Sequence, residues 1–146
     1  MRVAYTDGGS RGNPGPAGWG VRIEDADGNL VDEFCGSLGT ATNNVAEYQG
    51  LLAALKWARD HGVAALRVRS DSELLVKQMN GLYRVKNPGL QPLHREAQQL
   101  AREIGRVTFE HVRREQNAEA DRLANQAMDE AGAAPAPRRG QGAFDW

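Results

Sequence analysis

The 146-residue chain contains little cysteine, few aromatic side chains and no excess of charge of either sign. Its single cysteine, Cys35, excludes an internal disulfide and a cysteine-rich zinc site. Lysine and arginine number 18 against 19 aspartate and glutamate residues, which gives a net charge of −1. This balance excludes a polybasic, histone-like binder of nucleic acid, although it leaves open a local binding site.

Long apolar runs are also missing from the sequence. The longest apolar run, 51–55, is far shorter than the roughly 20 residues that a membrane-spanning helix needs. The first ten residues lack a basic segment followed by an apolar stretch, so we expect no secretory signal peptide. With 40% hydrophobic and 25% charged residues, the composition is typical of a soluble globular domain. We expect a cytoplasmic monomer that has no contact with membranes.

Hydrophobic periodicity separates one patterned domain, residues 1–130, from a C-terminal tail, residues 131–146. The tail is rich in alanine, glycine and proline and shows no period, so we expect it to be flexible. Its last residues include Phe144 and Trp146, two aromatic side chains that are costly to leave in water. We therefore expect the end of the tail to dock on the domain.

Within the domain, alternating apolar residues predict strands and apolar residues at helical spacing predict helices. The predicted strands cover 2–7, 18–24, 30–38, 66–71 and 107–112. The predicted helices cover 42–60, 72–80, 90–104 and 117–130. The glycine- and proline-rich run 8–16 is predicted to be a loop. Three meandering strands followed by alternating strands and helices indicate an α/β fold with a mixed sheet.

Two acidic residues come at the predicted ends of strands. Asp7 ends the first strand, and Asp71 ends the fourth. The helix between these strands can serve as a crossover, so the two strands can pair in parallel at the centre of the sheet. Both carboxylates would then project at the carboxyl edge of the sheet, where such sheets bind ligands.

Two more acidic residues lie about one turn inside predicted helices. Glu47 follows Asn43 by four residues, and Asp121 follows Asn117, which we expect to cap its helix, by four. The helix dipole favours negative charge at this position. Four carboxylates brought together repel one another, and divalent cations would relieve the repulsion. Oxygen ligands alone favour Mg²⁺ or Mn²⁺ over Zn²⁺.

Four blocks of this sequence together resemble type 1 ribonuclease H. The blocks are 5–15 (YTDGGSRGNPG), 42–47 (TNNVAE), 70–72 (SDS) and 117–121 (NAEAD). They occur in the order found in the family, and the resemblance extends from residue 1 to about residue 130. It implies the ribonuclease H-like fold, a five-stranded mixed sheet flanked by helices.

The resemblance also implies an activity and a site. The family hydrolyses the RNA strand of RNA–DNA hybrids with two metal ions, Mg²⁺ or Mn²⁺, and leaves 5′-phosphate and 3′-hydroxyl ends. Four residues fall on its catalytic, metal-binding carboxylates: Asp7, Glu47, Asp71 and Asp121. Three fall on positions that contact the RNA strand and its 2′-hydroxyl groups: Ser10, Gly12 and Asn43. Three fall near the DNA strand or its phosphate pocket: Asn13, Thr42 and Asn44.

The chain departs from the family pattern at three places near these blocks, one of which is Glu73, where relatives often have a glutamine that contacts the minor groove. Many relatives carry a histidine in a flexible loop before the last acidic residue, whereas residues 112–117 contain none. The segment that grips the hybrid in well-known relatives is dense in lysine and arginine, whereas residues 81–96 contain only Arg84, Lys86 and Arg95. Fewer phosphate contacts predict weaker and less salt-sensitive binding of the substrate.

Two other function classes remain open from the residues. One is a catalytically silent nucleic-acid-binding module that keeps the fold, although clustered carboxylates repel phosphate unless a metal ion is bound. The other is a metal-dependent phosphatase, although Asp7 is followed by two glycines where one large phosphatase class has Asp-x-Asp.

Overall fold

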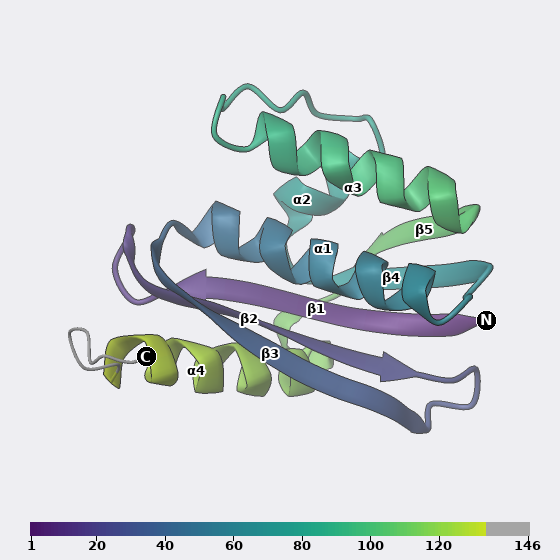
Figure 1. The fold of residues 1–146 in the computed structure, drawn as a ribbon, viewed down its shortest axis with the longest axis horizontal. Helices are drawn as coiled ribbons and strands as arrows, with labels where there is room; N and C mark the ends of the chain where they lie inside the picture. Colours follow the sequence, from purple (N-terminus) through teal and green to yellow (C-terminus); the bar gives the residue numbers. More distant parts are fainter. Residues whose placement is uncertain (134–146) are drawn as a thin grey trace.

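The computed structural model describes residues 1–133 of the chain, and Figure 1 shows their arrangement. The strands are β1 (Arg2–Ser10), β2 (Gly15–Glu24), β3 (Leu30–Ala41), β4 (Ala65–Ser70) and β5 (Arg106–His111). The helices are α1 (Asn43–Asp60), α2 (Glu73–Met79), α3 (Gln91–Ile104) and α4 (Ala118–Ala133), with one 3₁₀ turn, η1 (Arg114–Gln116). No helix in this part of the chain combines the length and apolarity needed to cross a membrane.

The five strands form one mixed sheet in the order β3-β2-β1-β4-β5. β1 pairs antiparallel with β2 and parallel with β4, and β4 pairs parallel with β5. The α1 segment connects β3 to β4 and so brings the fourth strand beside the first. The predicted α/β class, the mixed sheet and the parallel pairing of the first and fourth strands are confirmed.

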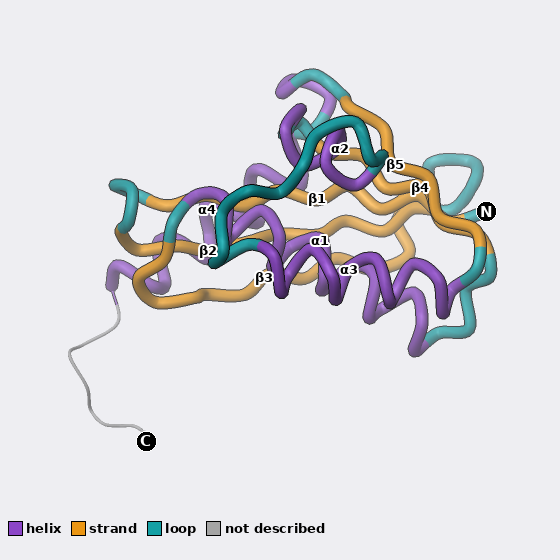
Figure 2. The backbone as a smooth tube through the Cα atoms, turned by 90° about the horizontal axis from the view of Figure 1, so that it is seen from above, coloured by secondary structure: helices purple, strands orange, loops and turns teal. Residues whose placement is uncertain are grey.

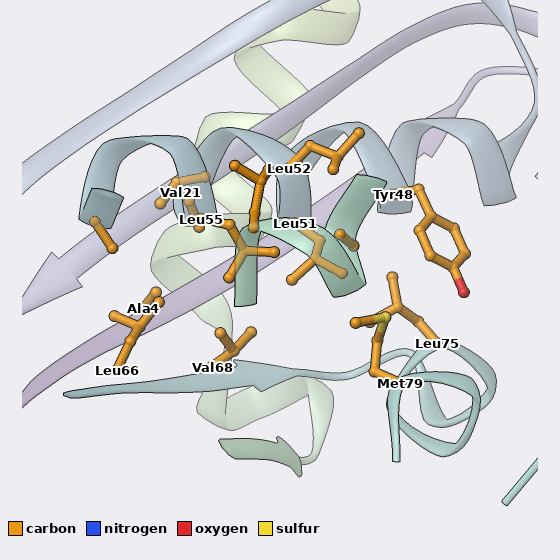
Figure 3. Packing of buried hydrophobic residues seen from close by; sticks show 14 of the residues in the cluster. Ala4, Val21, Tyr48, Leu51, Leu52, Leu55, Leu66, Val68, Leu75 and Met79 are labelled. Atoms are coloured by element: carbon orange, nitrogen blue, oxygen red, sulfur yellow. The ribbon is translucent and has the colours of Figure 1, made fainter. Parts of the chain in front are cut away.

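Helices cover both faces of the sheet. In Figure 1, α1, α2 and α3 lie on one side and α4 lies on the other, and Figure 2 shows α1 beside α3. The main core lies under α1, where Leu51 and Leu55 point toward Ala4 and Val68 of the central strands (Figure 3). On the opposite face α4 approaches β2 closely, since a Cβ on Gly20 would lie 2.5 Å from the Leu123 Cβ.

The first strand is longer than the sequence predicts. It continues past Asp7 through Gly8 and Gly9 to Ser10, so the predicted loop 8–16 shrinks to the turn between β1 and β2. The glycines pair with β2 in register, and Gly9 lies opposite Gly18. Sheet hydrogen bonds and the narrow space between α1 and α4 therefore override the turn preference of glycine. The third strand is likewise longer, reaching Ala41 instead of 38.

The last helix also differs from the prediction at both ends. Asn117 does not cap α4 through its side chain; its Nδ2 donates to the Thr6 carbonyl oxygen at 2.9 Å, and its Oδ1 accepts from no described residue. At the other end the helix runs to Ala133, three residues beyond the predicted boundary. The rest of the predicted tail, including Phe144 and Trp146, lies outside the described residues.

Candidate active site

Three carboxylates from three separate elements converge at one edge of the sheet. Asp7 lies in β1, Asp71 follows β4 directly, and Glu47 lies in the second turn of α1. One oxygen from each of the three lies within 4.8 Å of the other two. Thr6 pairs with Ser70 in the parallel ladder, so the residues that follow them are neighbours. The predicted meeting of Asp7 and Asp71 is confirmed, although Asp7 lies inside its strand and not at its end.

Glu47 reaches this cluster because α1 begins where the sequence predicts. Thr42 is the N-cap of α1, and its Oγ1 accepts a hydrogen bond from the Val45 backbone N–H at 3.2 Å. The carboxylate of Glu47 then points back to the sheet, where its Oε1 is buried and accepts no hydrogen bond from any described residue. A buried acceptor without a partner is costly, and a bound cation would satisfy it.

Asp121 joins the cluster from the opposite face of the sheet. It lies in the first turn of α4, and its backbone N–H donates to the Asn117 carbonyl oxygen at 3.0 Å. Its side chain lines the same cleft as the other three carboxylates, although it is not in the group of three whose oxygens lie within 4.8 Å of one another. All four predicted acids therefore meet in space.

Burial and mutual repulsion shift the acidity of this cluster in the metal-free protein. The pKa of Asp7 is raised to about 8, first by burial and then by the neighbouring Asp71 and Asp121 carboxylates. The pKa of Glu47 is raised well above its ordinary value, first by burial and then by the Asp7 and Asp71 charges. Without a cation, Asp7 and Glu47 hold their protons more tightly than ordinary carboxyl groups, and a divalent cation would displace these protons.

The carboxylates line a cleft of about 590 Å³. Beside it, Ser10 donates its backbone N–H to the Asn43 Oδ1 at 2.7 Å, and Asn43 donates its own backbone N–H to the Asn13 Oδ1 at 3.1 Å. Gly12 lies at the exposed turn with a φ of 96°, a conformation that favours glycine. Ser10, Gly12, Asn13 and Asn43 thus form one connected rim at the start of α1.

Not every predicted substrate-binding residue lines the cleft. Ser10 and Asn43 do, whereas Gly12 and Asn13 contact them from the rim. Thr42 uses its hydroxyl oxygen to cap α1, and Asn44 is exposed beyond the cleft lining.

Several residues that line the cleft were not among the predicted site residues. They are Gly8, Gly9, Arg11, Arg114, Asn125 and Met128. Arg114 lies in η1, with its Nε 4.0 Å from the Asp71 Oδ2, while Asn125 accepts from the Arg11 guanidinium at 3.1 Å. The i, i+4 spacing from Asp121 places Asn125 on the same helical face, which is a signal that the sequence already contains.

Of the two longer regions that depart from the family pattern, residues 112–117 reach the cleft through Arg114, whereas no residue of 81–96 lines it. The histidine nearest in sequence to the last acid, His111, is exposed at the end of β5 and does not line the cleft. Between α2 and α3, residues 80–90 form neither a helix nor a strand.

Comparison with known proteins identifies the family and the relatives of this chain. A family model described as reverse transcriptase-like matches residues 5–127. The bifunctional protein Rv2228c of Mycobacterium tuberculosis is 50% identical over 130 residues, which cover 88% of this chain and 36% of the relative. Ribonuclease HI of Halobacterium salinarum is 43% identical over 128 residues, which cover 88% of this chain and 64% of the relative. The chain thus spans about a third of the length of its mycobacterial relative.

Solved structures agree with the sequence comparison. The N-terminal RNase H domain of Rv2228c from Mycobacterium tuberculosis superposes with a TM-score of 0.87 at 48% identity, covering 90% of this chain and 95% of that chain. LC11-RNase H1, isolated from compost and solved in complex with an RNA/DNA hybrid, gives a TM-score of 0.87 at 43% identity, covering 91% and 100%. The resemblance and the fold predicted from the sequence are confirmed: the chain belongs to the reverse transcriptase-like family, as a domain of the type 1 ribonuclease H kind.

Proposed function

We propose that this domain is a metal-dependent endonuclease that hydrolyses the RNA strand of RNA–DNA hybrids and leaves 5′-phosphate and 3′-hydroxyl ends. The observation that carries the proposal is the convergence of Asp7, Glu47, Asp71 and Asp121 in one cleft. A relative 43% identical to this chain is named ribonuclease HI, and a structural neighbour was solved with an RNA/DNA hybrid.

The donor set fits divalent metal ions. Every side chain of the cluster offers carboxylate oxygens, which Mg²⁺ and Mn²⁺ prefer, and the Glu47 Oε1 is buried without a partner among the described residues. We propose that the four carboxylates hold two Mg²⁺ ions, with Mn²⁺ as a substitute. When bound, such a pair supplies an activated water and neutralises charge on the leaving 3′ oxygen.

The protein's own groups prepare this site in two ways. The parallel pairing of β1 and β4 sets Asp7 beside Asp71 on a rigid sheet, so little rearrangement is needed when cations bind. Asp7 is buried and the Glu47 Oε1 is out of contact with solvent, and charges interact more strongly where the surroundings have a low dielectric constant.

The rim beside the carboxylates supplies the contacts to the nucleic acid. Asn43 accepts from the Ser10 backbone, which holds its side chain in one orientation at the edge of the cleft. We propose that Ser10, Gly12 and Asn43 contact the 2′-hydroxyl groups of the RNA strand. This group distinguishes RNA from DNA, so the contact would select the strand that is cut.

In this proposal the DNA strand of the hybrid is bound by three neighbouring polar residues. The contacts to this strand or its phosphates would come from Asn13, Thr42 and Asn44. Asn13 acts in part by supporting Asn43, and Thr42 by capping α1, whose N-terminus favours negatively charged groups.

A cleavage assay tests the proposal against its alternatives. Matched substrates of RNA–DNA hybrid, single-stranded RNA, duplex RNA and duplex DNA are incubated with and without Mg²⁺. We expect cleavage of the RNA strand of the hybrid only when Mg²⁺ is present. Binding of the hybrid without cleavage would favour a silent binding module, and hydrolysis of a phosphate monoester alone would favour a phosphatase.

We also propose that the domain acts as a monomer. All four carboxylates and the rim come from one chain, so no second copy is needed to complete the site. Sedimentation equilibrium measures this directly. The cytoplasmic location stays a prediction from composition.

A further inference from the structure

Asn117 lies where the elements that carry the acidic residues meet. It is 1% exposed and occupies the position between η1 and α4. Its Nδ2 lies 2.9 Å from the Thr6 carbonyl oxygen and 3.5 Å from the Asp71 Oδ1. Its own carbonyl oxygen accepts from the Asp121 N–H at 3.0 Å. Asn117 therefore contacts Asp71 and Asp121 directly. It also contacts Thr6, the residue that precedes Asp7.

The chemistry of these contacts determines which way the Asn117 amide points. The Thr6 carbonyl and the Asp71 carboxylate are both acceptors, so only the NH₂ group can face them favourably. Its two hydrogens match the two acceptors. The amide oxygen then faces away, is buried, and accepts from no described residue.

This orientation of the Asn117 amide is not the one that would stabilise the fold most. Asparagine directly before a helix normally uses its side-chain oxygen to accept from the first turn. Here that cap is given up and the oxygen is left without a partner among residues 1–133. The side chain is instead directed at the carboxylate cluster, where the positive end of its dipole offsets the repulsion between like charges.

We propose that Asn117 is a positioning residue for the metal site, an inference that rests on the proposed function. Its NH₂ group holds the Asp71 Oδ1, so the rotation of this carboxylate is set before a cation arrives. The other oxygen, Oδ2, lies toward Arg114 at 4.0 Å. Through its backbone carbonyl the same residue sets the start of α4, which carries Asp121. Groups that orient metal ligands in this way contribute strongly to metal affinity.

Two substitutions separate this role from a structural one. Asn117→Ser removes the NH₂ group but places a hydroxyl where it can cap α4, so we expect the protein to fold. Asn117→Leu keeps the number of side-chain heavy atoms and the branch at Cγ, and it removes both the donor and the unpartnered acceptor. The matched control is Gln78→Leu. Gln78 is another buried amide, 5% exposed, and its Oε1 accepts a hydrogen bond of 2.6 Å from the Tyr48 hydroxyl. It does not line the carboxylate cleft.

The measurement is Mg²⁺ binding to the substrate-free protein by isothermal titration calorimetry, beside the melting temperature in EDTA. We expect both Asn117 variants to bind Mg²⁺ at least about tenfold more weakly, the lower end of the range for groups that orient metal ligands. Asn117→Ser should melt near the wild-type temperature. Gln78→Leu should melt earlier and bind Mg²⁺ as the wild type does.

The outcomes distinguish failure of this inference from failure of the proposed function. If the wild type binds Mg²⁺ and Asn117→Ser binds it equally well, Asn117 does not position the site. If Asn117→Ser fails to fold, its role is structural, and the inference is again overturned. A wild-type protein that binds no Mg²⁺ would instead contradict the proposed metal-dependent function itself.

Discussion

Gly8 of β1 lies directly against the backbone of Ala46 on α1, since a Cβ on residue 8 would sit 2.3 Å from the Ala46 carbonyl carbon. The chain neighbours of these two residues are Asp7 and Glu47, so this contact brings these two acidic residues together. Gly50 adds a second close approach, because a Cβ there would lie 2.9 Å from the Asp7 carbonyl oxygen. Backbone packing between strand and helix therefore sets the distance between two of the carboxylates.

The first prediction follows from this contact. Gly8→Ala pushes β1 and α1 apart, and overpacking of this kind costs about 1–3 kcal/mol of unfolding free energy. We expect that loss in urea denaturation, together with weaker Mg²⁺ binding. Gly132→Ala is the control, because a Cβ there meets Pro16 only at 3.7 Å and alanine favours the helix. A Gly8→Ala protein as stable as the wild type would show that the strand and helix can separate freely.

The second prediction concerns the charge of the site. Asp7→Asn removes one metal-ligand charge with almost no change in size. We expect hybrid cleavage to fall at least about a hundredfold, equivalent to about 2.7 kcal/mol in barrier height. The metal-free variant should melt at a higher temperature than the wild type, because repulsion with Asp71 and Asp121 is relieved. Near-normal turnover would refute the role of Asp7 as a metal ligand.

The third prediction is a pH dependence of stability. The pKa of Asp7 is about 8 in the folded, metal-free protein, whereas an aspartate in an unfolded chain has a pKa of about 3.9. The folded state holds this proton more tightly, so the stabilising contribution is complete below about pH 4 and is lost as pH rises through about 8. In EDTA we expect the melting temperature to decline over this window.

The same measurement with Mg²⁺ provides the check. Because the cation replaces the proton, added Mg²⁺ should raise the melting temperature more near pH 8 than at mildly acidic pH. The Asp7→Asn protein, which lacks this titrating group, should show a shallower decline in EDTA. An equal Mg²⁺ effect at both ends of the window would argue against proton displacement.

The fourth prediction concerns strand choice. A hybrid whose RNA strand carries 2′-O-methyl groups should resist cleavage, because the proposed contacts of Ser10, Gly12 and Asn43 read the free hydroxyl. The comparison is made in a gel assay with an unmodified hybrid of the same sequence. Equal cutting of the modified and the unmodified RNA strand would refute the proposed recognition of the 2′-hydroxyl.

Much of the candidate site could be predicted from local sequence patterns. Apolar alternation located β1 and β4, and the acidic residues at or near their ends indicated a shared edge of the sheet. Caps and helical spacing placed Glu47 one turn inside α1, where Thr42 does cap the helix. These inferences succeeded because they depend on side-chain period and on residues close in the chain.

Other features depend on partners that are distant in the chain. Gly8 and Gly9 have the sequence signature of a loop, yet β2 pairs with both, and the α1 backbone leaves no room for a side chain at Gly8. Asn117 has the sequence signature of a helix cap, yet Thr6 and Asp71, distant in sequence, attract its NH₂ group. Local preferences are weak compared with the sheet pairing, close packing and charge that long-range contacts impose.

The sequence by itself therefore determined the element order, the mixed sheet and the identity of the four acidic residues, because periodicity and motif spacing are local properties. Only the tertiary structure decided how near these residues lie, which of their oxygens lack partners, and that Arg114 stands beside Asp71. Distances between carboxylates on β1, α1, β4 and α4 are fixed by how closely helices pack on a sheet. That closeness depends on glycines and alanines facing one another across elements, which no local pattern reveals.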